Sequence, residues 1–286
     1  MKTIGIYPNT VNDIDFLGTA KVIDTLRGKA RIMMHRDLEA QLCSSLGDAV
    51  LGATEFVADD ELYTLPDAMV VLGGDGTIIK AARQCTPGKI PIIGVNLGRI
   101  GYMAELELDE LELLERLCTD DYTVENRMML EALVGEQKMF ALNEVVFGGE
   151  SVFRIVEIEL YCDGSLVNCY RADGLIAATP TGSTAYSMSA GGAVVDPRLE
   201  ALLITPICSH SLSATPLVFS ADSELKIKNV TLREEKLYFS ADGCETYPLM
   251  YGETVTVRRC AESVGFIRLK TGGFYEALRH KMADRH

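Results

Sequence analysis

Residues 67–80 read Asp-Ala-Met-Val-Val-Leu-Gly-Gly-Asp-Gly-Thr-Ile-Ile-Lys, and this stretch decides the fold. The run from Ala68 to Leu72 is short, unbroken and apolar, and it ends in glycines, as the buried strands of parallel sheets do. Helical character begins at Ile78, so the glycines occupy a turn from a strand to a helix. Because ligands of open α/β sheets bind at this edge, the stretch predicts a ligand site beside Gly73.

The chemistry of this turn favours a phosphate ligand. Three glycines let an anion approach the backbone, and the following helix offers free N–H groups and a positive dipole end. Asp75 would repel phosphate unless its carboxylate takes a proton or meets a metal. The alternative is a tight turn in which Asp75 caps the helix. Gly-Gly-Asp-Gly-Thr at a strand end favours the functional interpretation, with Lys80 as a weaker candidate because such lysines are more often solvated.

Better-known motifs do not fit the chain. A dinucleotide fingerprint that starts at Gly74 needs glycine where Ile79 stands, and a P-loop that starts at Gly73 needs glycine where Ile78 stands. The residues His35-Arg36-Asp37 imitate a protein-kinase catalytic loop, but Leu42 occupies its asparagine position and the chain has no Asp-Phe-Gly. We interpret residues 35–37 as a strand-to-helix turn.

Composition and charge narrow the function classes. The 286 residues are 48% hydrophobic and carry a formal net charge of −14, which disfavours nucleic-acid and membrane-surface partners. Eight scattered cysteines without Cys-x-x-Cys, and only four histidines, indicate reduced thiols in a cytoplasm and no dedicated metal site. The N-terminus is typical of a first strand and not of a signal peptide, and no apolar run reaches the ~18 residues of a membrane span.

The pattern of elements predicts two domains. Strands at 2–8, 30–34, 68–72 and 90–95 alternate with helices at 14–26, 38–46 and 108–117, as in a doubly wound α/β domain. Most later segments are strands, predicted at 128–134, 137–146, 155–163, 166–172, 175–178, 225–230, 237–241 and 254–259, with a helix at 274–282. We expect an α/β domain of residues 1–121 and 263–286, to which the C-terminal helix returns. Residues 122–262 are expected to form a β-rich, antiparallel, sandwich-like domain.

The β-rich half carries a second group of polar residues. Asn143-Glu144 follows an apolar run, and together these side chains could hold a ribose or an amide edge. Taken alone, the pair is more simply a turn that ends a strand. Farther along, residues 179–189 hold seven hydroxyl side chains, which could form an orienting surface for sugar and base edges. The alternative, a Ser/Thr-rich surface loop, seldom lies between apolar strands. Arg171 is permanently charged and suits an anionic ligand better than Arg154 does.

These motifs occur together and in a fixed order. They are Gly73–Thr77, Asn96–Gly101, Asn143-Glu144, Asp173-Gly174 and Thr179–Gly192. In this combination the chain closely resembles the ATP-NAD kinase family, from the first strand to Asp242-Gly243. Gly-Gly-Asp-Gly-Thr alone is shared with diacylglycerol, sphingosine and 6-phosphofructokinase-type kinases, whereas the 179–192 block is much more specific. The chain differs from many relatives at Cys244, where glutamine is usual, at Thr215, where arginine is common, and at Tyr102, where phenylalanine is usual.

The resemblance implies an activity. The family transfers the terminal phosphoryl of ATP, or sometimes of polyphosphate, to the 2′-hydroxyl of the adenosine ribose of NAD. A divalent metal, expected to be Mg²⁺, would arrive with ATP, and Asp75 would act as the general base. Members are usually homodimers or homotetramers. The residues implied to bind nucleotide are Gly74, Gly76, Thr77, Lys80, Asn143, Glu144, Arg154, Arg171, Asp173, Thr181, Thr184, Ala185, Tyr186, Ser187, Met188, Ser189 and Cys244.

Two alternative functions remain at this point. A lipid kinase would share the glycine-rich turn, but the acidic composition and the hydroxyl-rich segment argue against it. A non-catalytic NADP-binding sensor would bind the product without phosphoryl transfer, and the presence of Asp75 makes this less favourable. An assay with NAD, ATP and magnesium separates the three.

Overall fold

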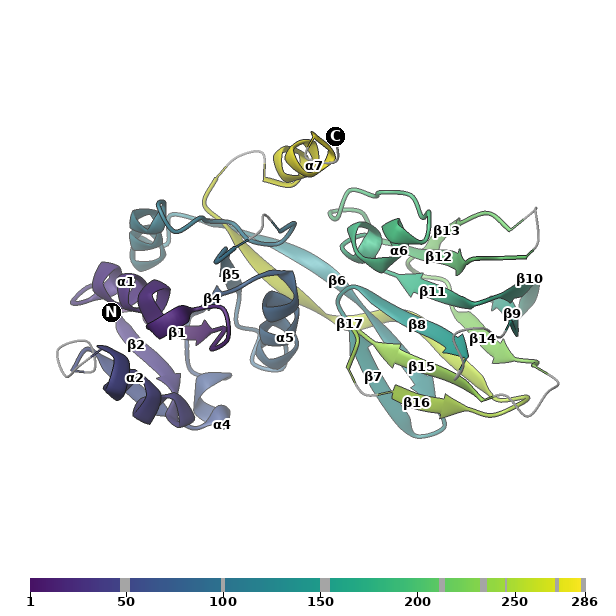
Figure 1. Ribbon diagram of the computed structural model, residues 1–286, viewed down its shortest axis with the longest axis horizontal. Helices are drawn as coiled ribbons and strands as arrows, with labels where there is room; N and C mark the ends of the chain where they lie inside the picture. Colours follow the sequence, from purple (N-terminus) through teal and green to yellow (C-terminus); the bar gives the residue numbers. More distant parts are fainter. Residues whose placement is uncertain are drawn as a thin grey trace. The chain divides into compact units, whose positions relative to one another are not determined.

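The structure is a computed structural model that describes residues 1–46, 52–98, 101–149, 155–210, 214–231, 236–244, 246–270 and 273–283, with side chains as far as residue 279. The chain forms two compact units, labelled by element in Figure 1. Unit 1 comprises Met1–Asn126 and Val264–His286, and unit 2 comprises Arg127–Ser263. Two long strands, β6 (Thr123–Val134) and β17 (Thr254–Arg268), contribute residues to both.

Unit 1 is built on a parallel sheet in the order β3-β2-β1-β4-β5, and the end of β17 pairs with β5. The strands are β1 (Thr3–Pro8), β2 (Arg31–His35), β3 (Thr54–Val57), β4 (Ala68–Leu72) and β5 (Ile92–Val95). All five residues of β4 are buried, which explains its unbroken apolar sequence. The sheet grows in opposite directions from β1 and β4, so its topological switch point lies between these two strands.

Helices cover both faces of this sheet. Side chains of α1 (Leu17–Leu26), α2 (Glu39–Leu46) and the 3₁₀ helix η3 (Leu111–Thr119) share one core with Ile93 and Val95 of β5. Between those two residues, Gly94 points to the other face, where a Cβ atom would lie 2.5 Å from Ile78 of α5 (Asp75–Cys85). Helix α7 (Gly273–Ala283) also belongs to unit 1. The doubly wound prediction is confirmed. The remaining short helices are η1 (Ile14–Phe16), η2 (Arg36–Leu38) and α4 (Asp59–Leu62).

Unit 2 contains two antiparallel sheets. One has the order β13-β12-β11-β8-β15-β16, and the other contains β10-β9-β14-β17 with β6 and β7 paired beside β17. The remaining elements are β7 (Gln137–Ala141), β8 (Glu144–Gly149), β9 (Val156–Cys162), β10 (Ser165–Ala172), β11 (Gly174–Ala178), η4 (Gly182–Thr184), α6 (Tyr186–Ser189), β12 (Ala201–Ile207), β13 (Leu217–Ser220), β14 (Leu225–Asn229), β15 (Leu237–Ala241) and β16 (Thr246–Leu249).

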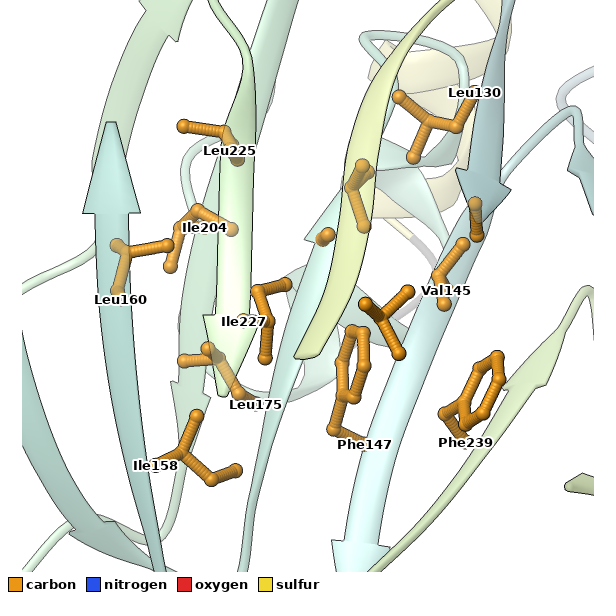
Figure 2. Packing of buried hydrophobic residues seen from close by; sticks show 14 of the residues in the cluster. Leu130, Val145, Phe147, Ile158, Leu160, Leu175, Ile204, Leu225, Ile227 and Phe239 are labelled. Atoms are coloured by element: carbon orange, nitrogen blue, oxygen red, sulfur yellow. The ribbon is translucent and has the colours of Figure 1, made fainter. Parts of the chain in front are cut away.

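One hydrophobic core joins the two sheets of unit 2 (Figure 2). Leu160 and Ile227 enter it from β9 and β14 of the sheet that contains β17, and Phe147 and Phe239 enter it from β8 and β15 of the other sheet. The two phenylalanine rings stack with centroids 5.8 Å apart. Burial alternates along β9 and β14, so each strand gives one face to this core. The sandwich-like prediction is therefore confirmed.

The predicted helix of residues 14–26 is wrong in its first turn. Helix α1 begins at Leu17, and Asp15 and Phe16 before it have φ angles of 53° and 55°, which interrupt the helix. The cause is Asp13, whose carboxylate accepts hydrogen bonds from the backbone N–H groups of Gly18 (2.8 Å) and Thr19 (2.9 Å). The Asp13 side chain thus supplies acceptors for the free N–H groups in the first turn of α1, and the preceding residues fold into a separate 3₁₀ turn.

Other boundaries also differ from the sequence predictions. The predicted strand at 137–146 is two strands, β7 and β8, with a break at residues 142 and 143. The predicted strand at 254–259 continues to Arg268 as β17, and η3 is a 3₁₀ helix and not an α-helix. Strands β3, β12, β13 and β16 were not predicted. Among the described residues, no helix is both long and apolar enough to cross a lipid bilayer.

Candidate active site

Asp75 is the first helical residue of α5, directly after the glycines that end β4. The N-cap position belongs to Gly74 and no side chain caps the helix, so Asp75 does not play the capping role of the alternative interpretation. Gly73 is packed so closely on the first turn that a Cβ atom would lie 2.6 Å from Thr77 Oγ1. Its backbone N–H donates to the carbonyl of Val95 on β5 (2.9 Å). The turn is thus fixed by its neighbours on the sheet.

The carboxylate of Asp75 is held by the second glycine-rich segment of unit 1. The backbone N–H of Tyr102 lies 3.1 and 3.0 Å from its two oxygens, and that of Met103 lies 3.1 Å from Oδ1. A Cβ atom on Gly101 would come within 2.2 Å of the same Oδ1. Only glycine at position 101 permits this approach, so the two segments form one structure with a half-buried carboxylate between them.

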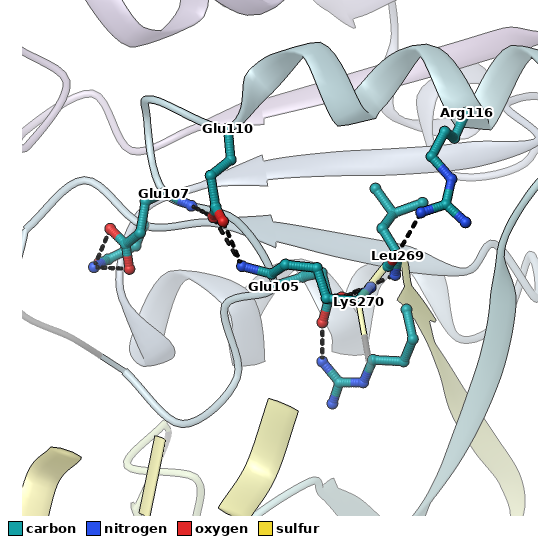
Figure 3. A network of polar contacts seen from close by, with 8 residues as sticks. Glu105, Glu107, Glu110, Arg116, Leu269 and Lys270 are labelled. Atoms are coloured by element: carbon teal, nitrogen blue, oxygen red, sulfur yellow. Dashed lines mark hydrogen bonds and ion pairs between the residues drawn. The ribbon is translucent and has the colours of Figure 1, made fainter. Parts of the chain in front are cut away.

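Asn96 bonds to a polar network that anchors the segment after β5, and Figure 3 shows Glu105, Glu107, Glu110 and Lys270 of this network. Its amide nitrogen donates to both carboxylate oxygens of Glu107, at 3.1 and 3.0 Å. The backbone N–H of Glu107 donates to Glu110 (2.9 Å), and Glu110 accepts from Lys270 Nζ at 2.9 and 2.8 Å. These contacts connect the Asn96 turn to the chain that follows β17.

Glu105 provides a second anchor in the same network. Its side chain is buried and accepts hydrogen bonds from the backbone N–H groups of Leu269 and Lys270, both at 2.8 Å, and from Arg268 Nη1 at 3.0 Å. A buried carboxylate with three donors is costly to disturb. Glu105 therefore fixes the backbone two residues after Met103, which supplies an N–H group to Asp75.

In unit 2, Asp242 shapes the turn that contains Asn143 and Glu144. Its carboxylate accepts from the three successive backbone N–H groups of Leu142 (2.7 Å), Asn143 (2.9 Å) and Glu144 (3.1 Å). From the other side, the backbone N–H of Thr179 donates to the Asn143 carbonyl (2.8 Å) and its hydroxyl donates to the Leu142 carbonyl (2.6 Å). The hydrogen bonds of Thr179 therefore join the start of the hydroxyl-rich segment to the Asn143-Glu144 turn.

Two buried acceptors in this turn have no partner among the described residues, namely Asn143 Oδ1 and Glu144 Oε2. Burial raises the pKa of Glu144 to about 7, the negative charge of Asp242 adds to the rise, and a hydrogen bond from the backbone of Tyr186 opposes it. A buried polar atom without a partner costs roughly 1–3 kcal/mol. Two such atoms side by side make the Asn143-Glu144 turn a candidate binding site.

The hydroxyl-rich segment is less exposed than predicted. Four of its seven hydroxyl residues are buried: Thr179, Thr181, Ser183 and Ser187. They bond within unit 2, as Ser183 does with Val195 and Ser187 with Thr205 Oγ1 (2.9 Å), because the segment must satisfy its own polar groups inside the fold. The remaining residues of the predicted binding block lie nearer the surface: Thr184, Ala185 and Met188 are half-buried, and Tyr186 and Ser189 are exposed.

Asp173 lies away from the Asn143-Glu144 turn. It precedes β11, where Gly174 pairs with Gly148, whereas Ala178 at the other end of β11 pairs with Glu144. Four residue steps along the strand separate these ends by about 13 Å. Arg171 is exposed near the Asp173 end, with its Nε 3.1 Å from Glu157 Oε1. Unit 2 alone does not bring these two predicted residues to the turn.

The other predicted residues are spread over both units. Gly74 and Thr77 are half-buried beside Asp75, and Gly76 and Lys80 are exposed on α5. Cys244 is exposed two residues after Asp242, and its backbone carbonyl accepts from Ser240 Oγ at 3.0 Å. Arg154 lies outside the described residues.

The sequence analysis gave no role to several residues that build these turns. Asn9 bonds to Thr77, buried Arg127 donates to Thr181 Oγ1 (3.3 Å), and Asp242 holds the Asn143-Glu144 turn. Only Asp242 had a signal, because Asp-Gly after an apolar run marks a turn. In the described part of the chain, no group of three or more His, Cys, Asp or Glu side chains is arranged to hold a metal ion.

A parallel α/β unit with a carboxylate held by backbone N–H groups at a glycine-rich turn, and an antiparallel β sandwich, together define a two-unit protein of the α/β-plus-β class. Sequence models of one family match both units: the ATP-NAD kinase N-terminal domain over residues 27–122 and the ATP-NAD kinase C-terminal domain over residues 142–269. The chain belongs to the ATP-NAD kinase family.

Relatives along the whole chain agree. The chain is 36% identical over 292 residues to an NAD kinase of Thermoanaerobacter sp. (strain X514), with all of both chains covered. It is 40% identical over 270 residues to an NAD kinase of Carboxydothermus hydrogenoformans, covering 92% of this chain and 93% of that protein.

Two solved structures share the fold. A yeast NADH kinase complexed with NADH matches with a TM-score of 0.90 at 21% identity, over 99% of this chain and 88% of that one. An NAD kinase from Archaeoglobus fulgidus in complex with ATP matches with a TM-score of 0.73 at 22% identity, over 98% of both chains. At these identities the likeness concerns the fold.

The buried carboxyl of Glu144 predicts a measurable effect of pH on stability. The pKa of Glu144 is about 7 in the folded chain, whereas the ordinary value of a glutamate, taken for the unfolded chain, is 4.5. At a pH between these two values, the folded chain therefore binds more protons than the unfolded chain. Rising pH therefore lowers the free energy of unfolding, by about 3 kcal/mol in total from this group. Glu144→Gln removes this dependence.

Urea unfolding at about pH 5 and about pH 8 measures it. Between these two pH values, the free energy of unfolding of Glu144→Gln relative to wild type should rise by most of that amount, about 2–3 kcal/mol. Glu136→Gln, at an exposed position in the turn between β6 and β7, is the matched control and should show no such rise. A constant difference between Glu144→Gln and wild type at both pH values would contradict the burial argument.

Proposed function

We propose that this chain is an NAD kinase that transfers the terminal phosphoryl of ATP to the 2′-hydroxyl of the adenosine ribose of NAD, giving NADP and ADP. The observation that carries the proposal is the Asp75 carboxylate, held by the N–H groups of Tyr102 and Met103 at the start of α5. Membership of the ATP-NAD kinase family supplies the substrates.

In the proposed reaction, the phosphates of ATP lie at the N-terminus of α5. The free N–H groups and positive dipole end of a helix suit this anion. Gly74 and Gly76 leave room for it, because a Cβ atom there would lie more than 4 Å from every described residue other than its chain neighbours and the backbone of its own helix. Thr77 and Lys80 would add a hydroxyl and a positive charge. Because phosphoryl transfer has a loose transition state, the protein mainly positions groups and offsets charge.

Asp75 would take the proton of the attacking hydroxyl. As the bond between the 2′-oxygen and the terminal phosphorus forms, the bond from that phosphorus to the bridging oxygen breaks, and its electron pair leaves with ADP. The hydroxyl proton passes to the Asp75 carboxylate. The two backbone hydrogen bonds keep this carboxylate in one orientation, so that little reorganisation is needed during transfer.

The Asn143-Glu144 turn would hold the dinucleotide. The support is the pair of buried acceptors, Asn143 Oδ1 and Glu144 Oε2, which hydroxyl groups of a sugar could satisfy. Thr184, Ala185, Tyr186, Met188 and Ser189 would contact its bases. The buried Thr181 and Ser187 would act by shaping the segment, and Cys244 would line the same turn through Asp242.

Further features follow from the proposal. Magnesium would be bound as the complex with ATP, because Mg²⁺ keeps several waters and takes most of its other ligands from phosphates. Arg171 and Asp173, at the far end of β11, would serve a nucleotide held by a second copy, so we propose a homodimer or homotetramer. Arg154 would meet phosphate, and the reaction would take place in the cytoplasm.

The direct test is incubation of the purified chain with NAD, magnesium and either ATP or polyphosphate, followed by enzymatic detection of NADP. We expect NADP to form only when a phosphoryl donor is present. A parallel assay with diacylglycerol as the phosphoryl acceptor tests the lipid-kinase alternative. NADP binding by calorimetry without any NADP formation would identify a sensor and contradict the proposal.

Asp75→Asn should retain NAD binding and lose most turnover. An amide of the same shape cannot take the proton, and loss of a general base typically lowers the rate by roughly 10²–10⁴. Steady-state kcat and NAD affinity by calorimetry measure the two effects. Asp60→Asn, at an exposed position in α4, is the control for the charge change. Turnover like that of wild type in Asp75→Asn would remove Asp75 from the chemistry.

Gly101→Ala should lower kcat by displacing the Asp75 carboxylate, because the added Cβ atom would lie 2.2 Å from Oδ1. Gly98→Ala in the same segment is the matched control, since its Cβ atom would meet no described residue within 4 Å. We expect a loss of roughly tenfold or more for Gly101→Ala and little change for Gly98→Ala, as a small displacement of a reacting group is costly. Equal activity of the two variants would show that the contact with Gly101 is not needed.

A further inference from the structure

Asn9 stands at the topological switch point of the unit 1 sheet. It directly follows β1, whose last residue Pro8 pairs with Leu72, the last residue of β4. The backbone N–H of Asn9 donates to the Leu72 carbonyl (2.8 Å). The sheet grows toward β2 on one side of this pair and toward β5 on the other. The crevice at such a point is where α/β sheets bind ligands.

The orientation of the Asn9 amide is fixed by its neighbours. Its Oδ1 accepts from the backbone N–H groups of Val11 (3.0 Å) and Asn12 (3.1 Å). A backbone N–H can only donate, so the oxygen must face these two groups. The Nδ2 then faces Thr77 Oγ1 at 2.7 Å and donates a hydrogen bond to it. This bond crosses from the loop after β1 to the first turn of α5.

The direction of this bond decides what Thr77 can do. A threonine hydroxyl has one proton, and here the oxygen already accepts from Asn9. Among the described residues, the Thr77 hydroxyl proton has no acceptor within hydrogen-bonding distance. Thr77 lies two residues after Asp75 in the same first turn, and it is half-buried. With no acceptor in the described part of the chain, this hydroxyl can donate to a bound ligand.

We propose that Asn9 is a positioning residue for the phosphoryl donor, which fixes the Thr77 hydroxyl as a hydrogen-bond donor to a phosphate oxygen of ATP. The inference rests on the proposed function. A phosphate oxygen is the fitting partner because it only accepts, and because the start of α5 favours negative charge. A carboxylate in place of the Asn9 amide would accept the Thr77 proton and reverse the bond.

Asn9→Asp tests the direction of the bond while keeping the shape of the side chain and the acceptor for Val11 and Asn12. We expect kcat/KM for ATP to fall roughly ten- to one hundredfold, the usual effect of losing a hydrogen bond to a charged group, with KM for NAD within about twofold. Thr77→Val should give a similar loss, and Thr77→Ser should restore most of the activity because it keeps the hydroxyl. Asn12→Asp places the same charge at an exposed position of the same loop and should match wild type.

The double variant separates positioning from simple repulsion. If Asn9 acts through Thr77, adding Asn9→Asp to Thr77→Val should cause little further loss, whereas independent effects would add. Unchanged ATP kinetics in Asn9→Asp, an equal rise of both KM values, or full additivity would overturn the inference. In those cases wild type would still form NADP, so the proposed function would stand. If wild type forms no NADP, the proposed function fails, and ATP affinity by calorimetry of wild type and Asn9→Asp still decides the inference.

Discussion

The contact between the Asp75 carboxylate and the N–H groups of Tyr102 and Met103 is the constraint around which unit 1 is arranged. It links the turn after β4 to the segment after β5, and it requires the missing side chain at Gly101. Two glutamates that follow in the chain hold this segment in place. Glu105 accepts a hydrogen bond from the backbone of Leu269, just after β17, and Glu107 accepts one from Asn96. Side chains distant in sequence therefore determine where one carboxylate stands.

Unit 2 also contains a carboxylate held by backbone N–H groups, and there it fixes the shape of a turn. Asp242 accepts three consecutive backbone N–H groups and so fixes the break between β7 and β8. Its negative charge also contributes to the raised pKa of Glu144. Asn143 Oδ1 and Glu144 Oε2 are buried without a partner among the described residues, and the fold tolerates this because the turn that carries them is held from both sides. Such a cost in stability is typical of a site that is completed by its ligand.

The sequence predicted the parts of the structure that depend on local pattern. The buried run of β4, the helix that begins after Gly74, and the alternation of β9 and β14 follow from hydrophobic period and glycine placement. Long-range hydrogen bonds could not be predicted in this way. The break before Leu17 depends on the Asp13 side chain, and the end of β7 depends on Asp242, about a hundred residues away in the chain. The burial of Ser183 and Ser187 was missed for the same reason, because composition does not say which way a hydroxyl points.

The glycines of the two motifs of unit 1 fall into two physical groups. Gly73 and Gly101 lie where a Cβ atom would collide with Thr77 or Asp75, so they are required by the packing of the protein on itself. Among the described residues, nothing lies within 4 Å of the same position at Gly74 and Gly76, so packing against these residues gives no reason for their lack of a side chain. Gly74 and Gly76 lie at the start of α5, where backbone N–H groups and the helix dipole favour an anion. Space without protein neighbours, next to a carboxylate that the protein holds firmly, is the arrangement that a phosphoryl group needs to approach a reacting hydroxyl.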